Sequence, residues 1–156
     1  MLIDTHCHLS CDDYNNLDEI INEFDGIMIA SGCDLKTNKE VIELVNKYDN
    51  VYGTLGIHPE EIENFKESDL KFIEDNLNNK KIVGIGEIGL DYYWVKDNKE
   101  QQKELFIKQL DIAKKYNKAV IVHSREAIQD TYDILKKYNI KGSIHCFNSS
   151  LEMARE

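Results

Sequence analysis

Short apolar runs alternate with amphipathic stretches along the whole chain. The runs are brief and rich in β-branched residues or glycine, which is typical of strands buried on both faces of a parallel sheet. They cover residues 2–3, 26–30, 51–57, 82–86, 119–122 and 142–144. The pattern therefore predicts six parallel strands.

The stretches between these runs have helical periodicity. The spacing i, i+3, i+4 and i+7, which forms one face of a helix, is found twice: in Val41, Leu44, Val45 and Tyr48, and in Ile128, Thr131, Tyr132 and Leu135. A longer amphipathic stretch covers residues 100–116, and Asn98 with Gln101 resembles a capping box at its start. Another helix is expected to begin at Leu151. Strands that alternate with helices predict an α/β fold of βαβ units around a parallel sheet.

The composition is that of a folded domain. The chain has 156 residues, of which 42% are apolar and 31% charged. No linker rich in Pro, Gly or Ser divides it, so residues 1–156 are expected to form a single domain. No apolar run approaches the roughly 20 residues that span a bilayer, and the N-terminus lacks a secretory signal. We therefore expect a cytoplasmic protein with no membrane partner.

The net charge and the spacing of the cysteines limit which functions and which chemical states are expected. The net charge of −10 argues against a protein that holds nucleic acid through a broad basic surface. Any contact with nucleic acid would have to be local, or assisted by bound cations. The four cysteines include no CxxC pair, which predicts free thiols.

Four of the five histidines and one glutamate stand at or just past the C-terminal end of a predicted strand. In a parallel barrel these ends open onto one face, so the side chains are expected to converge. Histidine and carboxylate ligands suit divalent metals, and residues two apart on a strand point the same way. Each residue taken alone also fits a structural role, such as a hydrogen-bonded core histidine. Together they predict a metal site formed by His6, His8, Glu87, His123 and His145.

Five ordered motifs run along the whole chain, at Ile3–Leu9, Gly56–Pro59, Gly86–Tyr93, Val122–Ala127 and His145–Phe147. Together they resemble the TatD-related hydrolases, metal-dependent DNases of the amidohydrolase-like barrel superfamily. It implies a metal-activated water that hydrolyses phosphodiesters, typically trimming single-stranded DNA from its 3′ end.

The resemblance also implies the ligand set. It requires two divalent metal ions, Mg²⁺, Mn²⁺ or Zn²⁺. His6 and His8 would bind the first ion, and His123 and His145 the second. Glu87 would bridge both ions and so would be the catalytic residue.

Three further residues are candidates for substrate contacts. His58 either contacts a substrate phosphate or hydrogen-bonds the site, or it is a turn residue fixed by Pro59. Arg125 either clamps a phosphate with its planar donor fork or is a solvated residue in the first turn of a helix. Asp91 either orients a ligand or caps a turn.

Two other features lie next to the predicted ligands. Tyr92, Tyr93 and Trp94 follow the strand associated with Glu87, and their rings either stack on the bases of a single strand or pack as core or lid. Cys146 follows His145, but strand alternation turns it away from the site and predicts a buried free thiol.

A barrel of this type usually needs about 250 residues. The resemblance implies two more strands and an aspartate in a Thr-Asp motif, which completes the first metal site and acts as general base. No residue of this chain corresponds to that aspartate. We therefore expect an incomplete TIM-type (β/α) barrel, the N-terminal portion with about six of the eight βα units. Its open edges would favour self-association.

Three functions stay open on these grounds. The first is a 3′–5′ deoxyribonuclease whose substrate is single-stranded DNA or another nucleic acid. The second is a hydrolase that uses the same metal site on another ester, such as a D-aminoacyl-tRNA. The third is a metal-binding protein without activity, because the aspartate is absent.

Overall fold

Six parallel strands form one sheet in the order of the sequence, so each strand pairs with the next along the chain. The structure, a computed structural model, describes residues 2–12 and 14–156. It confirms the predicted α/β fold. The strands are β1 (Leu2–Cys7), β2 (Gly26–Ser31), β3 (Val51–Leu55), β4 (Ile82–Asp91), β5 (Ala119–Arg125) and β6 (Gly142–Ile144).

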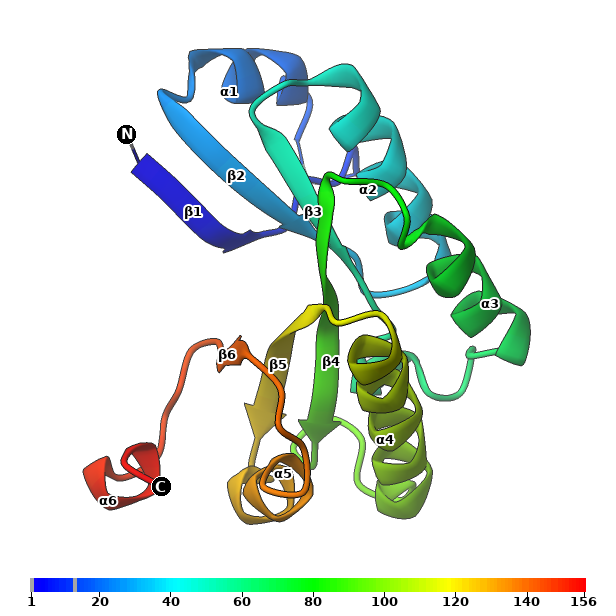
Figure 1. Ribbon diagram of the computed structural model, residues 1–156, viewed down its shortest axis with the longest axis vertical. Coiled ribbons are helices and arrows are strands. Elements are labelled where there is room, and N and C mark those ends of the chain that lie inside the picture. The colour runs from blue at the N-terminus through cyan, green and yellow to red at the C-terminus, as the bar shows by residue number, and fades with distance from the viewer. Residues whose placement is uncertain (1, 13) are drawn as a thin grey trace.

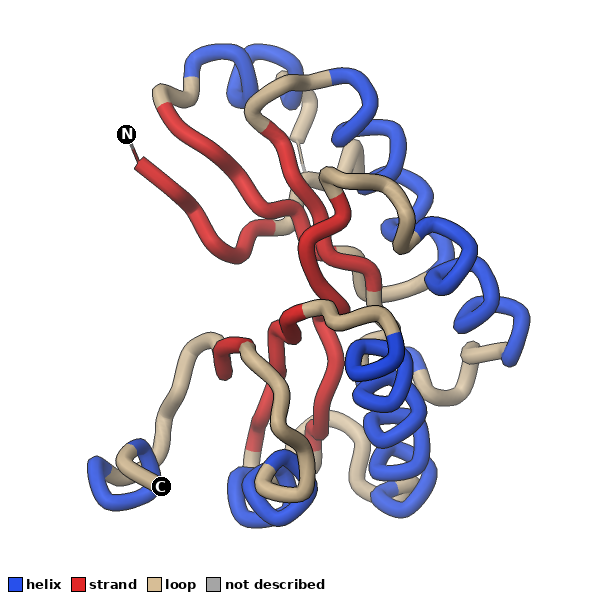
Figure 2. The backbone as a smooth tube through the Cα atoms, viewed as in Figure 1, coloured by secondary structure: helices blue, strands red, loops and turns tan. Residues whose placement is uncertain are grey.

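Helices connect the strands and cover one side of the sheet. In Figure 1, α2, α3 and α4 follow one face of the curled sheet, while the two chain ends lie toward the opposite face. Figure 2 shows the same separation of helices and strands. The helices are α1 (Leu17–Glu23), α2 (Leu35–Lys47), the 3₁₀ helix η1 (Pro59–Glu61), α3 (Glu67–Asn76), α4 (Lys99–Lys115), α5 (Ile128–Leu135) and α6 (Leu151–Ala154).

The core lies between the sheet and these helices. Ile82 and Ile85 of β4 and Phe106 and Leu110 of α4 are fully buried, and α4 packs on β4. Burying a side chain of this size stabilises a fold by about 1.5–3 kcal/mol. The amphipathic face of α4 therefore fixes the helix against the strand that carries Glu87.

Three buried amide side chains tie the helices to the ends of the strands. Each amide both donates to and accepts from the main chain of one residue, which satisfies groups that the sheet ladder leaves unpaired. Asn38 of α2 bonds Gly56, Gln109 of α4 bonds Ile57, and Gln102 of α4 bonds Asp91.

Two strands continue further than their apolar runs predict. β4 extends to Asp91 and β5 to Arg125, because their pairing continues past the last apolar run. Glu87 and His123 therefore lie within strands and not at or just past their ends. β4 also has one extra residue relative to β5 between Ile85 and Ile88, a bulge that re-aims nearby side chains.

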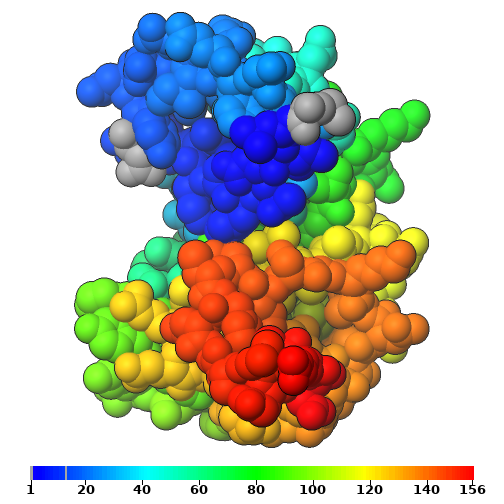
Figure 3. All heavy atoms as spheres, turned by 90° about the vertical axis from the view of Figure 1, so that its left-hand side faces the viewer, coloured from blue at the N-terminus to red at the C-terminus, as the bar shows by residue number. Residues whose placement is uncertain are grey.

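The edges of the sheet are open in the part of the chain that the structure describes. β1 and β6 each pair with a single neighbouring strand. Leu2 and Ile3 of β1 are 61% and 49% exposed. Figure 3 looks onto the side where the N-terminal and C-terminal segments face the viewer together. Among the described residues, no helix is long and apolar enough to cross a membrane.

Candidate metal centre

Glu87 lies at the centre of the site and is almost fully buried, with 3% of its side chain exposed. One of its oxygens, Oε2, faces the two histidines of the N-terminal motif. His6 Nε2 lies 3.3 Å from this oxygen and His8 Nε2 lies 3.2 Å from it. Both imidazoles thus meet one carboxylate oxygen.

The second oxygen, Oε1, faces the other three histidines. His145 Nε2 lies 2.6 Å from it, His123 Nδ1 3.0 Å and His58 Nε2 3.5 Å. The structure thus gathers the four predicted metal-site histidines, together with His58, around the carboxylate of Glu87. The histidines come from β1, the loop after it, the loop before η1, β5 and the residue after β6.

Two imidazoles have hydrogen-bond partners that fix their protons. His8 Nδ1 lies 3.2 Å from the carbonyl oxygen of Ser31, which can only accept, so this nitrogen carries the proton. His123 Nε2 lies 2.9 Å from Asp91 Oδ2, which also accepts. In their neutral forms, both rings therefore present a lone pair to Glu87.

Lone pairs that face a carboxylate at about 3 Å repel it unless a proton or a metal cation lies between them. The buried Nε2 of His6 adds to this arrangement, because it makes no hydrogen bond to any described residue. Glu87 groups within ligand distance with His6 and His8 on one side and with His58 and His123 on the other. Imidazole and carboxylate ligands commonly bind divalent cations, and the set of His6, His8 and Glu87 offers such ligands.

The electrostatics keep Glu87 ionised. Burial works to raise the pKa of its carboxyl group, but hydrogen bonds from His123 and His145, which form when the facing nitrogens carry a proton, outweigh burial and hold the pKa far below its usual range. Burial also works to lower the pKa of His123, and the carboxylates of Glu87 and Asp91 raise it above its ordinary value. The site therefore keeps a buried negative charge available to a cation.

His58 differs from the other histidines in where its proton lies. Its Nδ1 accepts a hydrogen bond from the main-chain N–H of Glu60, at 3.3 Å. The neutral ring therefore carries its proton on Nε2, the nitrogen that faces Glu87. His58 is thus a donor toward the site, and it also caps the short helix after Pro59. His58 therefore makes one contact for each of the two roles considered from the sequence: one to Glu87 of the site and one that caps the turn.

Ser31, at the end of β2, is a functional residue that the sequence motifs do not reveal. Its Oγ lies 2.9 Å from His6 Nδ1, and its carbonyl oxygen contacts His8. Thr54 donates a hydrogen bond to the same Oγ, at 2.9 Å. Ser31 thus orients both imidazoles that face Glu87 Oε2. This role becomes apparent only in the structure, where side chains of the neighbouring strands β1, β2 and β3 contact one another.

Asp91 connects His123 to the segment that follows β4. Its Oδ2 contacts His123, while its Oδ1 accepts from the main-chain N–H groups of Tyr93 and Trp94. Asp91 therefore both orients a histidine and caps a turn, the two alternatives that the sequence left open. Arg125 is not in the first turn of a helix, because it is the last residue of β5 and α5 begins only at Ile128.

The cysteines are all free, as the sequence predicted. The expected burial of Cys146 is wrong, because this residue is exposed. β6 ends at Ile144, so strand alternation no longer applies two residues later, where the backbone φ is +45°. Cys33 is near the site, with its Sγ 3.8 Å from His8 Nδ1.

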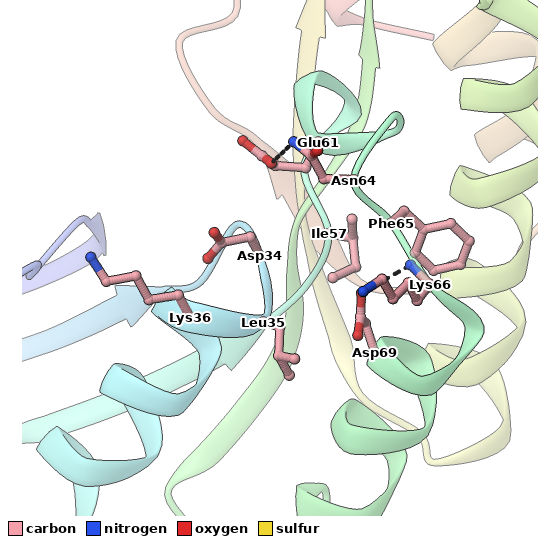
Figure 4. A pocket seen from close by; sticks show the side chains of 9 residues that line it. All are labelled: Asp34, Leu35, Lys36, Ile57, Glu61, Asn64, Phe65, Lys66 and Asp69. Carbon is pink, nitrogen blue, oxygen red and sulfur yellow. Dashed lines mark hydrogen bonds between the residues drawn. The ribbon is translucent and has the colours of Figure 1, made fainter.

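A cavity of about 160 Å³ lies apart from these ligands, between the start of α2 and the segment from η1 to α3. Figure 4 shows Leu35, Ile57 and Phe65 inside it and charged side chains such as Asp34 around them. Among the described residues, no histidine lines this cavity. The carboxylate–histidine cluster is thus a separate site.

Comparison with known proteins assigns this arrangement to a family. The family described as TatD related DNase matches residues 3–156. The chain belongs to the TatD-related DNase family. The resemblance of the five sequence motifs is therefore confirmed.

Relatives within the TatD-related family match this chain along almost its whole length. YabD of Bacillus subtilis, named an uncharacterized metal-dependent hydrolase, is 38% identical over 100% of this chain and 64% of its own length. YcfH of Escherichia coli, named in the same way, is 34% identical over 98% of this chain and 61% of its own. The chain thus spans less than two thirds of the length of these relatives.

Solved structures agree with the barrel architecture. YjjV of Escherichia coli, titled a TatD homolog, matches with a TM-score of 0.86 and 31% identity over 99% of this chain and 63% of its own. A TatD family hydrolase of Entamoeba histolytica matches with a TM-score of 0.84 and 26% identity, over 99% and 60% respectively. The TatD-related chain described here therefore has the fold predicted from its sequence.

Proposed function

We propose that this chain carries the metal centre of a hydrolase that cleaves phosphodiester bonds, a 3′–5′ deoxyribonuclease acting on single-stranded DNA. One observation carries the proposal. In their neutral forms, His8 turns a lone pair toward Oε2 of Glu87 and His123 turns one toward Oε1. The name of the matching family and the metal-dependent hydrolase names of the relatives support it.

The proposed ligands follow the two oxygens of the carboxylate. His6 and His8 would hold one divalent ion together with Glu87 Oε2. His123 and His145 would hold a second ion together with Oε1. The ions, which we propose to be Mg²⁺, Mn²⁺ or Zn²⁺, would supply the positive charge that activates a water and stabilises the leaving oxygen.

The remaining polar groups have roles that need no ligation. His58 carries its proton on Nε2 and can donate it in a hydrogen bond to Glu87 or to a phosphate oxygen. Asp91 holds His123 with Nδ1 turned toward Glu87. Such outer partners orient metal ligands and raise their basicity. Arg125, exposed at the end of β5 two residues after His123, offers donors to a phosphate.

The proposal is compatible with the acidic character of the chain. A net charge of −10 provides no general attraction for DNA. Bound cations are often the largest local charges in a site and reverse its electrostatics. Phosphate binding at the metal centre would therefore depend on the bound ions, and chelation should remove it.

The direct test is degradation of 3′-end-labelled single-stranded DNA by the 156-residue chain, with Mg²⁺ or Mn²⁺. We expect metal-dependent release of mononucleotides, which EDTA abolishes. The rate should be low, because the family resemblance implies an additional aspartate that has no counterpart here. Glu87→Gln should release no mononucleotides, since it removes the shared negative charge.

Two results would contradict the proposal. One is a folded, metal-loaded chain that leaves the DNA intact. The other is trimming that Glu87→Gln does not reduce. Release of amino acid from a D-aminoacyl-tRNA without release of mononucleotides would instead assign the same metal centre to another ester.

A further inference from the structure

Two exposed aromatic rings and one guanidinium lie together beside the metal centre. Tyr93 and Trp94 follow β4 and are 39% and 61% exposed, and Arg125 is exposed at the end of the adjacent β5. We call these three residues the aromatic platform. Large aromatic side chains left this exposed commonly mark a binding surface.

The three groups of the aromatic platform contact one another. The two rings meet edge to face, and the guanidinium lies over both rings. The ring centroids of Tyr93 and Trp94 are 4.6 Å apart and nearly perpendicular. The Arg125 guanidinium carbon lies 4.4 Å from the centroid of Tyr93 and 5.4 Å from that of Trp94. Both distances are within the range of cation–π attraction.

Arg125 keeps its hydrogen-bond donors available. No carboxylate of a described residue forms an ion pair with it, and its contacts are with the two rings. It is one of only two arginines in the sequence, the other being Arg155. A guanidinium that stacks on a ring still offers its in-plane N–H groups to a phosphate.

The aromatic platform is held in place by groups that also serve the metal centre. Asp91, whose Oδ2 contacts His123, accepts from the main-chain N–H groups of Tyr93 and Trp94. The buried side chain of Gln102 bonds the main chain of Asp91 and the carbonyl oxygen of Val95. The turn is thus fixed at both ends, which lowers the entropy lost when a ligand binds.

The neighbouring Tyr92 shows what structural packing of an aromatic residue looks like here. It is buried, with 8% of its surface exposed, and its hydroxyl donates to Asp130 at 2.7 Å. Tyr93 and Trp94 have no comparable burial. The predicted core packing therefore holds for the first aromatic residue of the run and not for the other two.

We propose that the aromatic platform binds a nucleobase of a single-stranded nucleic acid by stacking, while Arg125 donates hydrogen bonds to an adjacent phosphate. This inference rests on the proposed nuclease function, whose substrate it places next to the metal centre. Stacking on aromatic rings tolerates every base, because each has a π face. The acidic chain needs such local contacts to hold a polyanion.

Trp94 is the only tryptophan of the chain, so its fluorescence reports on the platform directly. The experiment titrates the 156-residue chain, in Mg²⁺, with a short oligothymidylate whose phosphorothioate linkages resist hydrolysis. Stacking predicts saturable quenching of the Trp94 emission. An abasic oligomer of the same length and backbone should bind roughly tenfold more weakly or worse.

Matched variants separate the platform from exposed residues of the same type elsewhere. Tyr93→Ala and Arg125→Ala should each weaken binding of the oligothymidylate by about tenfold. Tyr14→Ala and Arg155→Ala remove an exposed tyrosine and the other arginine, and they should bind like the unmodified chain. Circular dichroism would check that each variant keeps its fold.

The outcomes distinguish this inference from the proposed function. Equal binding of the abasic oligomer, or no effect of Tyr93→Ala, would overturn stacking even if the chain hydrolyses DNA. Saturable quenching with no hydrolysis of ordinary DNA would support the platform and contradict the nuclease. A concentration-dependent change in Trp94 emission without oligonucleotide would assign the surface to contact between copies and overturn the inference.

Discussion

At the scale of single residues, the site depends on which nitrogen of each imidazole carries the proton. The Ser31 carbonyl sets this for His8 and Asp91 sets it for His123, whereas a main-chain N–H sets the opposite arrangement for His58. His8 and His123 can therefore act as metal ligands, whereas His58 acts as a hydrogen-bond donor toward the site. A sequence motif identifies the histidines but does not contain this information.

Ser31 provides a prediction at this scale. Ser31→Ala removes the Oγ that contacts His6 Nδ1 and accepts from Thr54, so the His6 ring loses the group that orients it. Loss of such a partner typically weakens metal binding by about 10–100-fold. Titration calorimetry with Zn²⁺ should show the loss at one site. Ser68→Ala, at an exposed serine of α3, is the matched control. Unchanged Zn²⁺ affinity in Ser31→Ala would contradict this role.

At the scale of elements, two side chains on one face of α4 form hydrogen bonds with the main chain at the ends of two strands. Gln102 and Gln109 are seven residues apart, about two helical turns, and each is 1% exposed. Gln102 bonds Asp91 and Gln109 bonds Ile57, the residue before His58. Both bonded residues adjoin the metal centre, so α4 positions two of its parts.

Gln109→Leu tests this arrangement. The leucine keeps most of the volume but leaves the N–H and C=O of Ile57 unpaired in the interior. An unsatisfied buried group costs about 1–3 kcal/mol. Urea unfolding should show a loss of stability in this range or above. Gln101→Leu, at an exposed position of the same helix, should change the midpoint little. Equal shifts in the two variants would rule out the role of Gln109.

Hydrophobic periodicity predicted some elements closely and others incompletely. α5 spans residues 128–135 as the apolar spacing indicated. The capping box expected at Asn98 and Gln101 does not form, because the Asn98 side chain instead accepts from Gln102. β4 was predicted too short, since Glu87 and Asp91 are polar yet buried within it. Buried polar residues are invisible to a pattern that equates polarity with the surface.

At the scale of the whole molecule, the sheet is curled, and among residues 2–12 and 14–156 no strand pairing closes it between β1 and β6. Convergence of the strand ends could be predicted, because it follows from parallel strand order alone. The contacts within the cluster could not, because they depend on bulges and on side chains from neighbouring strands. The motifs therefore identified all six side chains around the centre, while Ser31 and the buried amides became apparent only in the structure.

The open edges predict self-association. Leu2 and Ile3 expose apolar surface on an edge strand with unpaired main-chain groups, which favours pairing with another copy. Sedimentation velocity should show an average mass that rises with protein concentration. The double variant Leu2→Lys, Ile3→Lys should reduce the association, whereas Ile107→Lys on α4 should not. A monomer at every concentration would contradict the prediction.

The number of metal ions bound by the chain tests the central claim most directly, namely that the two oxygens of Glu87 serve two ions. It can be measured by equilibrium dialysis with Mn²⁺ or Zn²⁺ and elemental analysis. We predict two ions per unmodified chain, none in Glu87→Gln, and one in His123→Ala, where the His6 and His8 side remains. The same number of ions in the unmodified chain and in Glu87→Gln would contradict the bridging role.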